Sequence, residues 1–243
     1  MTNPIGRTLL LLCSLFVIAC GSNNATNPTP GAGGSAGGAT GQAGSSGGGA
    51  GGGSGTGGSA DVIVPTPEGT LFMDDFESGV AKWDVTQGTC SALADGTTVF
   101  NCINGGNEAR ALAGDIGWGE YSVQARVKVN AMDAGKRIYL AGRFTDSNNW
   151  YGAGIYNATP PEVQIRKKVA GTSSDVARTS YPFTIGTGTW YTLKLEMKGS
   201  TLRLSVDGVL QLEIADSTFH SGKIALLVDR SDISWDDVIV TNP

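Results

Sequence analysis

Residues 190–214 read WYTLKLEMKGSTLRLSVDGVLQLEI, and this stretch decides the fold class. Leu193, Leu195 and Met197 alternate with charged residues, which is typical of a strand with one buried face. Asp207-Gly208 adds a strong type I′ hairpin signal. The stretch therefore predicts three consecutive antiparallel strands joined by tight turns.

The same period of two recurs through the rest of residues 61–243. Apolar residues expected to face a core are Val123, Ala125, Val127, Val129, Leu140, Phe144, Val163 and Ile165. No window of ten residues shows a convincing helical stripe. Roughly a dozen short, half-buried strands predict an all-β, antiparallel sandwich of two sheets.

Several segments resemble the concanavalin A-like lectin/glucanase jelly rolls, including LamG-like domains. They are LFMDDFE (71–77) with Trp83, GEY (119–121), GRFTD (142–146), WYTLK (190–194) and WDDV (235–238). The resemblance covers nearly all of 71–241 and implies a jelly-roll sandwich. It says little about function, because the fold hosts lectins, carbohydrate-binding modules, glycosidases and polysaccharide lyases.

The first twenty residues have the parts of an export signal. Arg7 precedes an apolar run over 8–19, which is too short to span a bilayer of about 30 Å as a helix. The run ends in VIAC (17–20), which resembles the lipobox of bacterial lipoproteins. This implies a signal peptide over 1–19, lipidation of Cys20, and an exported protein anchored in a membrane at the bacterial cell surface or in the periplasm. The alternative is an ordinary secretory signal with an incidental cysteine.

The remainder divides into a linker over 20–60 and a domain over 61–243. Residues 21–60 are Gly-, Ser- and Ala-rich, without a charged or aromatic side chain, so we expect them to be disordered. The domain contains all 22 acidic residues and 16 of the 17 lysines and arginines, a net charge of −6. This balance gives no overall attraction to nucleic acid.

Two of the four cysteines, Cys90 and Cys102, belong to the predicted domain. In an exported domain, two thiols this close in sequence suggest a local disulfide. Two free buried thiols are the alternative. A metal site is disfavoured, because no histidine or further cysteine lies nearby.

The sequence lacks the catalytic patterns of related enzymes. Retaining glucanases of this fold carry Glu-x-Asp-x-Glu on one strand, and no such run occurs here. Alginate-lyase-type members use Gln-x-His, whereas this chain has Gln164-Ile165-Arg166, and arginine cannot act as a neutral base. His220, the single histidine, is expected in an exposed loop. These observations favour binding over catalysis.

The outward faces of the strands carry a candidate glycan-binding surface. Its members are Gln124, Arg126, Lys128, Tyr139, Arg143, Gln164, Arg166 and Lys168, with Trp150 and Tyr151 close by in sequence. Aromatic rings stack on sugars and arginine forks bind their polar groups. Several cations in a net acidic domain favour an acidic polysaccharide such as pectate or alginate. The alternative is an ordinary solvated strand face.

A structural calcium ion is a further expectation. In related jelly rolls, such an ion often links the first and last strands. Asp236 matches the position in the last strand, with Asp74, Asp75 and Glu77 as candidate partners. Carboxylate oxygens without nitrogen or sulfur ligands suit Ca²⁺.

We therefore predict a surface-anchored, lectin-like module that binds carbohydrate. Two alternatives stay open. A polysaccharide lyase or glycoside hydrolase with a non-standard site would direct attention first to Arg143, Gln164, Arg166 and Tyr139. An adhesion module would instead bind protein.

Overall fold

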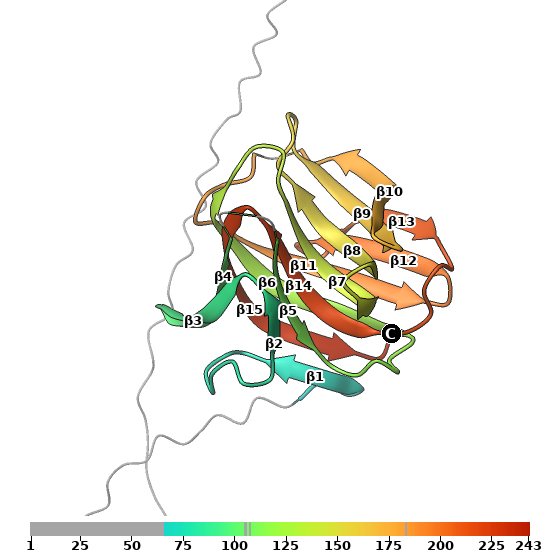
Figure 1. Cartoon of the computed structure of the whole chain (residues 1–243), viewed down its shortest axis with the longest axis horizontal. Helices are drawn as coiled ribbons and strands as arrows, with labels where there is room; N and C mark the ends of the chain where they lie inside the picture. The colour runs from blue at the N-terminus through green and yellow to red at the C-terminus, as the bar shows by residue number, and fades with distance from the viewer. Residues whose placement is uncertain (1–65, 105, 107, 183) are drawn as a thin grey trace, which may run out of the picture. The chain divides into compact units, whose positions relative to one another are not determined.

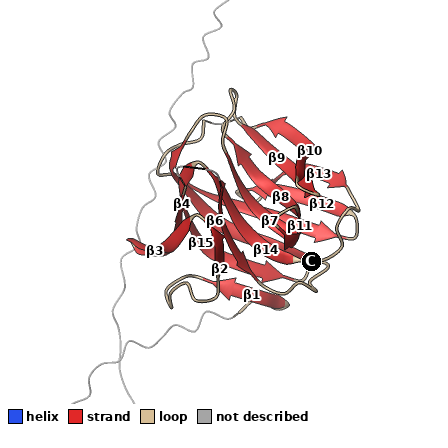
Figure 2. Cartoon of the chain, in the orientation of Figure 1, coloured by secondary structure: helices blue, strands red, loops and turns tan. Residues whose placement is uncertain are grey.

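The structure, a computed structural model, describes residues 66–104, 106, 108–182 and 184–243. These residues form strands, turns and loops without a helix (Figure 2). Accordingly, the described part of the chain has no helix that could cross a membrane. The predicted signal peptide (1–19), the lipidation site Cys20 and the linker (20–60) lie outside the described residues.

Fifteen strands follow one another along the described residues. Their bounds are β1 (Thr70–Asp74), β2 (Asp84–Gln87), β3 (Thr89–Asp95), β4 (Thr97–Ile103), β5 (Glu108–Ala113), β6 (Tyr121–Met132), β7 (Arg137–Asp146), β8 (Asn149–Tyr156), β9 (Glu162–Val169), β10 (Thr172–Ser180), β11 (Trp190–Lys198), β12 (Thr201–Val206), β13 (Val209–Ala215), β14 (Lys223–Asp229) and β15 (Ser231–Thr241).

The strands form two antiparallel sheets (Figure 1). The eight-stranded sheet has the order β13-β12-β11-β6-β15-β4-β3, with β1 paired to β15. The seven-stranded sheet has the order β10-β9-β8-β7-β14-β5-β2. The predicted all-β, antiparallel two-sheet architecture is confirmed.

The main core consists of apolar side chains from both sheets. Leu193, Leu195 and Met197 of β11 are fully buried, as their alternation predicts. The predicted inward residues of β6 and β9, and Leu140 of β7, also belong to this core. Trp235 of β15 is among the largest fully buried side chains. Burying several aliphatic and aromatic side chains, each contributing about 1.5–3 kcal/mol, drives the two sheets together.

Strand β7 breaks its alternation near Arg143. This residue has a left-handed φ of 45°, and the pairing of β7 with β8 and with β14 shifts register there. Such a bulge uses one extra residue and moves the following side chain to the other face. Phe144 therefore packs outside the main core, with Ala225 and Leu227 of β14. The prediction of an inward Phe144 was wrong for this reason.

A second, smaller apolar cluster covers the outer face of the seven-stranded sheet. Its members are Tyr139, Ala141, Phe144, Trp150, Ala225 and Leu227, with Leu112 packed against them. They come from the central strands β7, β8 and β14 and from β5. The members of the cluster are buried, so other side chains on this face of the sheet cover them.

The disulfide prediction is confirmed. Cys90 and Cys102 lie directly opposite each other in the β3–β4 ladder and are bonded. The bond joins two strands at one edge of the eight-stranded sheet.

Candidate functional site

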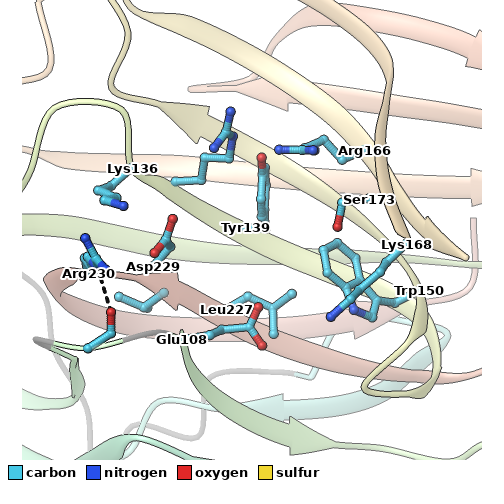
Figure 3. A pocket seen from close by; sticks show the side chains of 13 residues that line it. Glu108, Lys136, Tyr139, Trp150, Arg166, Lys168, Ser173, Leu227, Asp229 and Arg230 are labelled. Carbon is cyan, nitrogen blue, oxygen red and sulfur yellow. Dashed lines mark hydrogen bonds between the residues drawn. The ribbon is translucent and has the colours of Figure 1, made fainter. Parts of the chain in front are cut away.

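A pocket of about 380 Å³ opens on the outer face of the seven-stranded sheet (Figure 3). Strands β5, β7, β8, β9, β10 and β14 all contribute to it. Its charged lining consists of Glu108, Lys136, Arg137, Arg166, Lys168, Asp229 and Arg230. The rest includes Tyr139, Trp150, Ser173 and Leu227.

Two aromatic rings form the apolar part of the pocket. The ring centroids of Tyr139 and Trp150 are 6.3 Å apart, with an interplanar angle of 46°. Gly152 leaves room for both, because a Cβ atom there would lie 2.9 Å from the Trp150 ring and 3.2 Å from Tyr139. Rings of this size and mixed polarity suit flat, partly apolar ligands such as sugars.

A hydrogen-bond network holds Tyr139 in place. Its hydroxyl donates to Oε1 of Gln164 at 3.1 Å, and Nε of Arg137 donates to the same oxygen at 3.3 Å. Nε2 of Gln164 donates in turn to Glu162 at 2.9 Å. Burial raises the pKa of Tyr139 far above its ordinary value, despite the nearby Arg166 and Arg137. The phenol therefore stays protonated at neutral pH.

Positive charge dominates the pocket, with five cations against two carboxylates. Nε of Arg166 lies 3.0 Å from Oδ1 of Asp175, and Nε of Arg230 donates to the carbonyl of Gly106 at 2.6 Å. Lys136 and Lys168 make no ion pair within the described residues. This surplus lies in a domain whose sequence is net negative.

Five of the ten residues of the predicted glycan-binding surface come together at this pocket. Tyr139, Trp150, Arg166 and Lys168 line it. Gln164 is fully buried and bonded to Tyr139, so it supports the lining.

Gln124, Arg126 and Lys128 lie elsewhere, which corrects the prediction of a single three-stranded face. They belong to β6, which pairs with β11 and β15 in the other sheet. Lys128 forms an ion pair with Asp95, and Nη1 of Arg126 lies 3.0 Å from Asp237. The prediction failed because the chain changes sheets between β6 and β7, where we expected neighbouring strands.

Arg143 is a second correction. Its side chain is 1% exposed and lies away from the pocket. The guanidinium donates to the carbonyls of Gly119, Phe219 and Gly199, each at 3.0 Å. Burial lowers its pKa, and the carbonyls compensate for lost hydration. The residue joins three connecting segments and does not face the pocket.

Tyr151 is a third correction, because it is fully buried in the main core. Its hydroxyl lies 2.5 Å from Oδ1 of Asp216 and accepts from the backbone N–H of Thr218 at 2.8 Å. Although burial opposes it, hydrogen bonds from Lys167, Thr218 and Tyr151 hold the pKa of Asp216 well below its ordinary value. Since Trp150 and Tyr151 are consecutive in a strand, only one of them can face outward.

Sequence reasoning missed several lining residues. Arg137 stands two positions before Tyr139 on the same strand, so alternation alone could have placed it on the same face. Lys136, Ser173, Leu227, Asp229 and Arg230 gave no such signal, because their proximity depends on how β14 and β10 pair within the sheet.

The acids expected to bind calcium have other partners. Asp75 accepts from the backbone N–H of Glu77 at 3.2 Å, and Glu77 accepts from that of Thr98 at 2.8 Å. Asp236 accepts from the N–H of Asp237 and lies 3.7 Å from Arg126. Over the residues with described structure, no three His, Cys, Asp or Glu side chains are grouped so that they could hold a metal ion. The calcium site stays a prediction that this geometry does not support.

Solved structures share the fold of this chain. The carbohydrate binding module CBM66 from Bacillus subtilis aligns with a TM-score of 0.57 and 19% identity, over 66% of this chain and 96% of the module. A protein of unknown function with a galectin-like fold, also from Bacillus subtilis, aligns with a TM-score of 0.57 and 14% identity, over 71% and 96%. The β-glucanase of Bacillus licheniformis aligns with a TM-score of 0.54 and 14% identity, over 73% and 100%.

At these identities the likeness establishes the fold, and the predicted concanavalin A-like jelly roll is confirmed. No protein-family model and no curated protein matches the sequence.

Proposed function

We propose that this chain is a carbohydrate-binding module, and that its ligand occupies the pocket between Tyr139 and Trp150. One observation carries the proposal: two aromatic rings and five cations surround a single cavity on the outer face of one sheet. Rings provide stacking surfaces for sugars, and cations bind their acidic substituents. Among the proteins of similar fold are a carbohydrate binding module and a β-glucanase, which fits this proposal.

The preferred ligand is an acidic polysaccharide. Lys136, Lys168 and Arg230 form no ion pair within the described residues, so their charges can turn to a ligand. The pKa of the Asp146 carboxyl group is lowered mainly by a hydrogen bond from Asn149, and Lys168 is close enough to lower it further. A local positive surface in a net negative domain selects anionic partners over neutral ones and speeds their association.

Binding without turnover fits the pocket better than catalysis. Glu108 and Asp229 are directly opposite in the β5–β14 ladder, but Nε of Arg110 donates to Glu108 at 2.9 Å. Burial raises the pKa of Tyr139 even further above neutral pH than that of an ordinary phenol, so this group is poorly suited to abstract a proton. Glu108 and Tyr139 are therefore better suited to hold a sugar than to cleave it.

The proposal includes an anchor at Cys20. The apolar run and VIAC sequence at 8–20 support an acylated amino terminus, and residues 21–60 would tether the domain at a distance of about 35 Å. Detergent-phase partitioning of the expressed protein, lost in Cys20→Ala, tests this part. Partitioning that survives the substitution contradicts it.

A glycan array of acidic and neutral oligosaccharides tests the binding function. We expect uronate-containing glycans to bind and the double variant Lys136→Ala/Lys168→Ala to lose affinity by at least tenfold. Lys194→Ala/Lys198→Ala removes the same charge from the other sheet and should bind normally. Equal losses in both double variants would contradict the pocket as the site.

Activity assays on the same glycans separate the remaining functions. Absorbance at 235 nm reports unsaturated products of a lyase, and reducing ends report a hydrolase. Turnover abolished by Tyr139→Phe would establish an enzyme. Absence of glycan binding would favour a protein-binding adhesion module.

A further inference from the structure

Three residues form one cross-strand row at an end of the pocket. Trp150 of β8 is directly opposite Lys168 of β9, which is directly opposite Ser173 of β10. All three line the pocket, and Figure 3 shows them together at one end of it. Adjacent strands are about 4.8 Å apart, so the row across three strands is about 10 Å long.

The indole N–H of Trp150 has no hydrogen-bond partner among the residues that the structure describes. The side chain is 4% exposed, and Nε1 makes no hydrogen bond within the described residues. Buried donors without an acceptor are rare in folded proteins, and each one needs a reason. An acceptor supplied by a ligand is such a reason, because the same side chain lines the pocket.

Lys168 is the neighbour that can expose this N–H. Its chain passes in front of the Trp150 ring in Figure 3, and the two residues are paired across the ladder. The ammonium group makes no ion pair within the described residues, in contrast to Arg166 in the next row, which Asp175 holds at 3.0 Å. Lys168 is therefore not held by an ion pair and can turn toward an anion, and we expect this turn to uncover the indole N–H.

We infer that this row binds the carboxylate of an acidic sugar. The inference rests on the proposed glycan-binding function and places its acidic group at one position. Nε1 of Trp150 and the Ser173 hydroxyl donate to the carboxylate oxygens, and the Lys168 ammonium neutralises their charge. Charge-assisted hydrogen bonds are the stronger kind, so the row supplies the preference for acidic over neutral sugars.

Two conservative variants test the row. Trp150→Phe keeps a ring and removes the N–H, while Lys168→Met keeps the chain and removes the charge. Calorimetric titration of the full chain compares three probes: short oligouronates (galacturonate, mannuronate and guluronate), their methyl esters, and neutral mixed-linkage gluco-oligosaccharides.

We expect each variant to weaken oligouronate binding by about tenfold. Lys168→Met should leave methyl-ester binding within about twofold, whereas Trp150→Phe should weaken ester binding less than acid binding, because the ester carbonyl also accepts from an indole N–H. Lys194→Met, on the other sheet, should change neither. Equal losses for acid and ester in both variants would overturn the placement of the carboxylate, while the glycan-binding function stands. If the wild-type chain bound the neutral gluco-oligosaccharides and not the oligouronates, the placement of the carboxylate would likewise be overturned and the glycan-binding function would stand. Binding of no probe would overturn the function as well.

Discussion

Replacing Arg143 tests whether its hydrogen bonds hold together three segments that connect strands of the sandwich. Its guanidinium is buried and donates to carbonyls of Gly119, Phe219 and Gly199. Arg143→Met keeps an unbranched side chain and the Cβ atom, so any strain of the left-handed φ of 45° is the same in both proteins. The substitution removes the guanidinium group, with its charge and its donors to the three carbonyls.

The magnitude follows from the three bonds. Hydrogen bonds from a charged group contribute about 1.5 kcal/mol each at the low end of their range, which suits carbonyls that are partly hydrated. The variant also avoids the cost of burying a cation, which offsets part of the loss. We expect a net loss of about 3 kcal/mol in the free energy of unfolding, or about 6–12 °C in Tm for a domain of this size.

Urea and thermal unfolding followed by tryptophan fluorescence measure this loss. The control is Arg126→Met, because Arg126 makes a partly exposed ion pair and should change stability by less than about 1 kcal/mol. Glycan affinity should be unchanged in Arg143→Met, since the residue does not line the pocket. A loss below 1 kcal/mol would refute the structural role, and a selective loss of glycan binding would restore the role predicted from sequence.

Three further predictions concern other parts of the domain. Reduction of Cys90–Cys102, twelve positions apart, should lower the free energy of unfolding by about 3 kcal/mol, and no change in the urea midpoint would contradict this. Because the folded-state pKa of Asp216 is depressed, its contribution to stability is present above the unfolded pKa near 4 and is lost as the pH falls through the folded value. Asp216→Asn should therefore make the free energy of unfolding fall less steeply as the pH is lowered below about 4. An unchanged pH dependence would contradict this prediction. Gly152→Ala should crowd the two pocket rings, lower the free energy of unfolding by about 1–3 kcal/mol and weaken glycan binding by at least fivefold in titration, whereas wild-type affinity would show that the ring spacing is unimportant.

The fold was predictable because its signals are local. Alternation over 190–214 and the turn at Asp207-Gly208 predict strands and hairpins, and the structure has β11, β12 and β13 there. Such patterns depend on which side chains face water, and the order of apolar and polar residues within each segment shows this directly. The same holds for Cys90 and Cys102, which are separated by a short hairpin.

The site was only partly predictable because it depends on non-local pairing. Alternation correctly gave Arg166 and Lys168 outward faces, but it could not reveal that β6 lies in the other sheet from β7. It also could not reveal the bulge that buries Arg143, since a one-residue shift leaves little trace in the sequence. Residues in or just after β14, such as Arg230, line the pocket because β14 pairs with β7, which is far from it in the sequence.

The indole N–H signals of the tryptophans in a ¹⁵N-correlated NMR spectrum report on the pocket residue by residue. Trp150 lies in the pocket, whereas Trp190 lies on the other sheet beside Arg126, 4.5 Å from its guanidinium carbon. On titration with oligogalacturonate, the Trp150 signal should shift and saturate while the Trp190 signal stays in place. A shift of Trp190 alone, or no shift of Trp150 at saturating ligand, would contradict recognition of an acidic glycan by the seven-stranded sheet.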